Sequence, residues 1–164
     1  MIATTSRRAL SLLTMLFVPL CFAQAPASTS PAQARAIVSV QKAAVAALNF
    51  PQGDAAAFNR ARADFTADGW KDFLAHMEGF LDANGAPTFT CRFVVRRDAR
   101  LLDEKDGVLH IRIPGSLTQS NKLGKTVYDR AAIEVHAVRD PSAGRIKIQK
   151  LEQVTCLGAS KSCD

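Results

Sequence analysis

The hydrophobic period changes once along this chain. Between Pro31 and Leu81 apolar residues recur every three or four positions, whereas after Pro87 they alternate with polar residues. A period near 3.6 is typical of helices with one buried face, and a period of two of strands with one buried face. This order predicts an α+β domain, with N-terminal helices packed on a curved four-stranded antiparallel sheet in a cone-like roll.

Two helices are expected at the start of the domain. Ser30 is a good N-cap, Pro31 suits the first helical position, and Gln33 completes a capping box, which predicts a helix over 31–48. A short second helix follows, capped by Asp54.

A third helix is expected after Thr66, a further N-cap residue, and Asn84-Gly85 is a strong helix stop. Its apolar positions follow helical spacing: Trp70, Phe73, Leu74, Met77, Phe80 and Leu81.

Four strands are predicted from the alternating runs at 89–96, 109–113, 127–136 and 146–149, the last extended by Val154 and Cys156. The segments 103–107, 115–124 and 140–144 are rich in turn residues and are expected to link them. A tightly packed interior could be filled by Phe58, Phe73, Phe89 and Phe93.

The N-terminus is typical of an export signal. Arg7 and Arg8 precede an apolar run over 9–20, and small residues stand at the two positions that a signal peptidase reads, Cys21 and Ala23. This pattern predicts a signal peptide over 1–23 and a periplasmic protein, while an uncleaved inner-membrane anchor remains an alternative. A flexible lead-in over 24–30, a single domain over 31–157 and a tail over 158–164 would follow.

Three cysteines remain after cleavage: Cys91, Cys156 and Cys163. Disulfides persist in oxidising compartments, so we expect one disulfide and one unpaired thiol. Cys156 could pair with Cys163 in a short loop, or Cys91 could pair with either, and the sequence does not choose between them.

The charge balance favours no nucleic-acid partner. Loss of Arg7 and Arg8 with the signal lowers the formal net charge from +6 to +4, and no concentrated basic patch is evident. The stretch Gly124-Lys125-Thr126 lacks the earlier glycine of a phosphate loop and leads into a predicted strand, so no nucleotide cofactor is expected.

No metal or catalytic site is predicted from residue spacing. His76, His110 and His136 lack the spacing of metal ligands, and no nucleophile elbow occurs.

Asp129 is the residue that fits its strand least well. Its parity places it with the inward residues Val127 and Ala131, and a carboxylate in an apolar pocket could act as a general acid or base. A bulge or the strand rim could instead return it to water. An alternative function is therefore a small-molecule binding protein or enzyme, with Asp129, Tyr128 and His136 lining a pocket.

Helices followed by a curved antiparallel sheet resemble the nuclear-transport-factor-2-like cone fold. A narrower resemblance lies in 64–74, which is similar to the periplasmic domain of the DotI/IcmL family, inner-membrane components of type IVB secretion and related conjugation machines. The matching residues are Phe65, Thr66, Gly69, Trp70 and Phe73.

The resemblance implies a role in assembly, with no catalytic residues to transfer. The favoured function is therefore a non-enzymatic periplasmic scaffold or accessory subunit. Its partners would be envelope or secretion-complex proteins, including a second copy of itself, with membrane contact only if the N-terminal segment is uncleaved.

Overall fold

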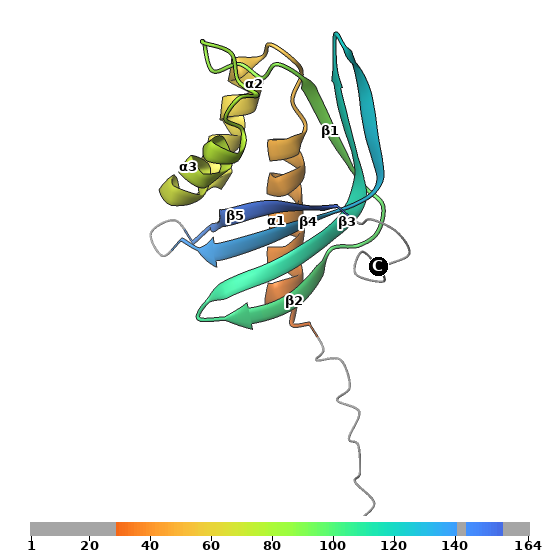
Figure 1. Cartoon of the computed structure of the whole chain (residues 1–164). Helices are drawn as coiled ribbons and strands as arrows, with labels where there is room; N and C mark the ends of the chain where they lie inside the picture. Colours follow the sequence, from red (N-terminus) through yellow and green to blue (C-terminus); the bar gives the residue numbers. More distant parts are fainter. Residues whose placement is uncertain (1–28, 141–143, 156–164) are drawn as a thin grey trace, which may run out of the picture.

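The computed structural model describes residues 29–140 and 144–155, and the predicted α+β class is confirmed, with every helix preceding every strand (Figure 1). The elements are α1 (Pro31–Leu48), α2 (Ala55–Arg60), the 3-10 helix η1 (Ala61–Asp64), α3 (Ala67–His76), β1 (Thr90–Val95), β2 (Arg100–Lys105), β3 (Val108–Asn121), β4 (Gly124–Arg139) and β5 (Ile146–Thr155).

The strands form one open antiparallel sheet in the order β1-β3-β4-β5, and β2 also pairs with β3. β3 is long enough for two partners on the same edge: β1 pairs along its C-terminal half and β2 along its N-terminal half. The distal β3–β4 hairpin rises as an arm beside the helices, which gives the sheet its strong curvature (Figure 1).

The sheet has five strands, not the predicted four. The sequence of β2 does not alternate, because five of its six residues are exposed and only Leu101 is partly buried. The segment predicted as a link at 103–107 is the end of this strand and a tight turn, in which Asp106 and Gly107 both have positive φ. Such a turn suits a two-residue hairpin. The link predicted over 115–124 is likewise mostly strand.

The third helix ends earlier than predicted. α3 stops at His76, and Met77 is its C-cap. The chain then turns through Gly79, which has a φ of 82°, and returns as an isolated bridge between Leu81 and Pro87. Met77 is still buried, but Phe80 is half exposed. The apolar spacing of the sequence therefore continues to Leu81, although the helix ends at His76.

Glycine at position 115 permits the bend of the sheet. A Cβ there would lie 2.4 Å from Cζ of Phe93, whose buried ring covers the Gly115 backbone. The register between β3 and β4 also shifts between Gly115 and Leu117, which marks a bulge. Bulges bend and twist the strand that carries them.

The core lies between the helices and one face of the sheet. α1 contributes mainly small side chains to it, which let this helix lie close to the strands. Four aromatic rings from α2, α3 and the segment between them form a cluster in which neighbouring ring centroids lie 5.3–5.8 Å apart: Phe58, Phe65, Trp70 and Phe73. The four phenylalanines expected to fill the interior are all buried.

Several sequence predictions concern segments that are not described. The signal peptide, all but the end of the lead-in, and the tail lie outside the described residues, as do Cys156 and Cys163. Within 29–140 and 144–155, no helix is long and apolar enough to cross a membrane.

Candidate functional site

The segment that carries the family resemblance fixes α3 onto the edge strand β5. The Thr66 backbone N–H donates to the carbonyl oxygen of Ile148 at 2.9 Å, and Phe65 forms a parallel bridge with the same residue. The Thr66 hydroxyl accepts from the Gly69 N–H at 3.0 Å and so caps the helix. One short stretch thus both starts the helix and attaches it to the sheet.

Gly69 is required by the closeness of this contact. A Cβ at Gly69 would lie 2.5 Å from the Ile148 carbonyl oxygen and 2.6 Å from that of Gln149. The next motif residues, Trp70 and Phe73, are buried in the aromatic cluster. All five motif residues therefore act in docking and packing, and none presents a reactive group to solvent.

The candidate pocket residues do not converge on one cavity. The bulge pairs Leu117 with Tyr128 and Gly115 with Ala131, so two residues of β4 oppose one of β3. This extra residue changes the parity: Tyr128 packs against the core and Asp129 is exposed. Asp129 therefore does not take the inward position that parity alone gives it; the alternative, in which a bulge returns it to water, is what the structure shows.

His136 instead belongs to a polar network on the sheet face opposite the helices. It pairs with His110 across β3 and β4, and the two rings stack with centroids 4.3 Å apart. His110 also contacts Glu134 at 3.1 Å and Asp103 at 3.3 Å, and Arg112 Nε donates to Glu134 at 2.9 Å.

The pKa values of both Glu134 and His136 are lowered in this network. Burial alone would raise the pKa of Glu134, but hydrogen bonds and positive charge from Arg112 and His110 together hold it below its ordinary value. The pKa of His136 is lowered, first by burial and then by the neighbouring charge of His110. The sequence placed both histidines on polar strand faces, but only the cross-strand register brings them together with Glu134.

No metal site is evident in the part of the chain that the structure describes, where no group of three or more His, Cys, Asp or Glu side chains is placed to hold an ion. The polar contacts given for His76 lie within its own helix, to the Asp72 carbonyl at 2.8 Å and the Asp72 carboxylate at 3.7 Å.

Cys91 is a buried free thiol on β1. Burial raises its pKa to about 12, so this thiol is held protonated and unreactive. Because Cys156 and Cys163 lie outside the described residues, the choice among the disulfide pairings stays a prediction.

An apolar cavity of about 430 Å³ lies between the end of α3 and strands β1, β3 and β5. Its lining includes Phe50, Phe73, Phe89 and Leu117, together with Cys91. Neither Asp129, Tyr128 nor His136 lines it. Four lining residues carry polar side chains: His76, Gln119, Glu152 and Gln153. Such a cavity suits a mainly apolar molecule with a polar group, since most of its lining is aromatic or aliphatic.

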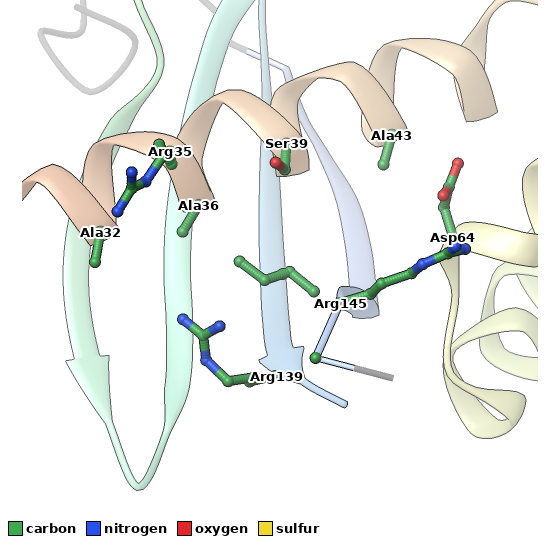
Figure 2. A pocket seen from close by; sticks show the side chains of 10 residues that line it. Ala32, Arg35, Ala36, Ser39, Ala43, Asp64, Arg139 and Arg145 are labelled. Atoms are coloured by element: carbon green, nitrogen blue, oxygen red, sulfur yellow. The ribbon is translucent and has the colours of Figure 1, made fainter. Parts of the chain in front are cut away.

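A second hollow, of about 480 Å³, is lined by three arginines from three separate places in the fold (Figure 2). Arg35 lies on α1, Arg139 ends β4, and Arg145 immediately precedes β5. Figure 2 shows the Arg139 side chain directed toward α1 and the Arg145 side chain extended toward Asp64. We call this feature the arginine groove. Arg35 is more than a hundred residues from Arg139 and Arg145 in the chain, so no local motif could reveal the groove.

The sequence matches no family model and no curated protein. Solved structures, however, share its fold. An IcmL-like type IV secretion system protein from Legionella pneumophila has a TM-score of 0.63 at 13% identity, covering 80% of this chain and 99% of that one. The periplasmic domain of DotI has a TM-score of 0.62 at 17% identity, covering 77% of this chain and 96% of that one. This chain therefore has the fold of the DotI and IcmL-like secretion proteins, as the motif in 65–73 predicts.

Proposed function

We propose that this protein is a non-enzymatic periplasmic component or accessory subunit of an envelope complex related to type IV secretion. The observation that supports this most is the match to two proteins described as an IcmL-like type IV secretion protein and the periplasmic domain of DotI. Nearly the whole of each solved domain is covered, so the likeness extends over the complete domain.

The chemistry of the described residues is in keeping with a role in assembly. On the outer sheet face Arg112 and Glu134 neutralise each other, and neither lines any of the cavities described above. The family-like motif is used for packing α3 onto β5. The predicted export signal would deliver this domain to the compartment in which such complexes are built.

The test is to tag the chain at its C-terminus in its natural host, remove the untagged gene, and cross-link the envelope before purification. We expect co-purification with secretion or conjugation subunits, an intact mass lacking residues 1–23, and loss of substrate transfer upon deletion. A variant lacking residues 2–23 is the control, and it should restore neither complex formation nor transfer. A deletion strain with normal transfer, in which the tagged chain purifies alone, would contradict the proposal.

A second candidate function, binding of an apolar small molecule, is favoured by the cavity between α3 and strands β1, β3 and β5. Native mass spectrometry of protein purified from the envelope should then show a bound small molecule, and a medium-chain fatty acid should raise the melting temperature. If neither occurs, this candidate is excluded. Unchanged ligand binding in an Asp129→Asn variant would separately exclude a role for that carboxylate.

A further inference from the structure

The arginine groove concentrates positive charge that the protein itself does not neutralise. Within residues 29–140 and 144–155, the guanidinium groups of Arg35, Arg139 and Arg145 make no hydrogen bond or ion pair, and all three side chains are exposed. Arg112 differs, since it pairs with Glu134 on the outer face. The hollow holds three cations against the single carboxylate of Asp64.

The hollow continues into a neighbouring one and so forms a groove along α1. This neighbouring hollow, of about 370 Å³, shares four lining residues with the 480 Å³ hollow: Ala32, Ala36, Arg139 and Ile146. At its far end Glu104 accepts a hydrogen bond from Gln33 at 2.9 Å, so this carboxylate already has a partner.

One face of α1 is built to leave this space open. Apart from Arg35, its lining side chains are small and recur at helical spacing, at Ala32, Ala36, Ser39 and Ala43. The stretch from Ala32 to Ala43 is about 16 Å long at the rise of an α-helix. An extended chain rises about 3.3 Å per residue, so this face accommodates about five residues of extended peptide.

The arrangement of the cations favours a chain over a compact anion. In Figure 2 the three arginines are spread along the groove and do not point at one spot. Guanidinium groups bind carboxylates in a planar, two-point geometry. The first turn of α1 also carries no acidic residue, so the positive end of the helix dipole adds to the field.

We propose that the arginine groove binds an acidic, extended segment of a partner protein, with Arg35, Arg139 and Arg145 pairing with its carboxylates. This inference rests on the proposed function, because it names the chemistry of one partner contact. The partner segment carries at least two Asp or Glu residues within about five positions.

The test uses the full mature protein and fluorescence anisotropy with labelled peptides of about ten residues, in which serine alternates with glutamate, with lysine or with glutamine. The glutamate peptide should bind, and its affinity should fall as salt is raised toward about 150 mM. The triple variant Arg35→Gln, Arg139→Gln, Arg145→Gln should weaken this binding about tenfold or more. The lysine and glutamine peptides should not bind.

A matched control removes the same charge elsewhere. Arg60, Arg92 and Arg130 are exposed and do not line the groove, so replacing all three with glutamine should change affinity by less than about twofold. An equal loss in both triple variants would reduce the effect to net charge and overturn the proposal. Circular dichroism of each variant checks that the fold is retained.

Further arms distinguish the other ligands that such a groove could take. Full competition by inorganic phosphate at millimolar concentration, or stronger binding to vesicles of phosphatidylglycerol than to the glutamate peptide, would overturn the proposal in favour of a compact anion or a membrane. A charge-reversed variant, Arg139→Glu, should weaken binding of the glutamate peptide further than Arg139→Gln does.

The two proposals fail in different ways. If the wild-type protein does not bind the glutamate peptide but still co-purifies with the envelope complex, only the groove assignment is lost. If the groove binds the peptide but the chain purifies alone from the envelope, the secretion-related function is lost. If both hold, the triple groove variant should also co-purify less of the complex than the control triple variant.

Discussion

Replacing Gly69 with alanine is expected to destabilise this protein, although alanine is the better helix former. In a helix interior, glycine to alanine ordinarily gains about 0.5–1 kcal/mol. Here the new Cβ would lie 2.5 Å from the carbonyl oxygen of Ile148, and the obstacle is backbone, which cannot rotate away. The propensity argument and the packing argument therefore predict opposite signs.

The size of the effect follows from the distances. Ordinary van der Waals contact begins near 3.4 Å, so the start of α3 must move about 0.9 Å from β5. The same movement would stretch the 2.9 Å hydrogen bond from Thr66 to Ile148 beyond hydrogen-bonding distance, at a cost of about 1 kcal/mol. Overpacking adds about 1–3 kcal/mol. After the propensity gain, the free energy of unfolding should fall by about 1–3 kcal/mol.

Urea unfolding followed by tryptophan fluorescence measures this directly. Trp70 is the only tryptophan and is buried beside Gly69, so its emission reports on α3 docking. Ala75→Gly, at an exposed site on the same helix, is the matched control and should cost about 0.5–1 kcal/mol through propensity alone. A Gly69→Ala protein as stable as the wild type, or more stable, would refute the packing argument.

Three further predictions concern the sheet. Gly115→Ala should lower the free energy of unfolding by about 1–3 kcal/mol in urea titrations, because its Cβ would meet the ring of Phe93 at 2.4 Å, and Phe93→Leu should recover part of that loss. The Cys91 thiol should resist a thiol reagent at pH 8 until denaturant is added, because burial excludes the reagent and raises the pKa to about 12; rapid labelling of native protein would be inconsistent with this. The pKa of His136 lies below 6.5 and that of Glu134 below 4.5 in the folded state, so the unfolded chain binds more protons in acid. Stability should therefore fall as pH drops below 6.5 and again below 4.5, and His136→Asn should flatten the first decline in a pH series of urea titrations.

The helix starts could be predicted because their determinants are local. The capping box of Ser30 and Gln33 forms as expected, with hydrogen bonds of 2.9 and 3.2 Å. Asp54 and Thr66 likewise cap the next two α-helices through their own side chains. Each cap involves residues three positions apart, so the sequence contains the whole interaction.

The missed features depend on neighbours distant in sequence. The edge strand β2 is polar because only one of its residues is partly buried, so no alternation marks it. The sequence left a bulge as one alternative for Asp129, and only the pairing between β3 and β4 decides that it forms near Gly115. Both depend on strand register, which the hydrophobic pattern specifies only where one face is buried.

The sequence by itself determined the class of fold, the order of its elements and the stretch from Phe65 to Phe73 that resembles the secretion proteins, because periodicity and capping are written in neighbouring residues. Tertiary structure alone decided why Gly69 must be glycine, where Asp129 faces, and that Arg35 meets Arg139 and Arg145 across one groove. These depend on how α3 approaches β5, how β3 registers with β4, and how the end of the sheet meets α1. Such distances are set by packing between segments that the chain brings together only when it folds.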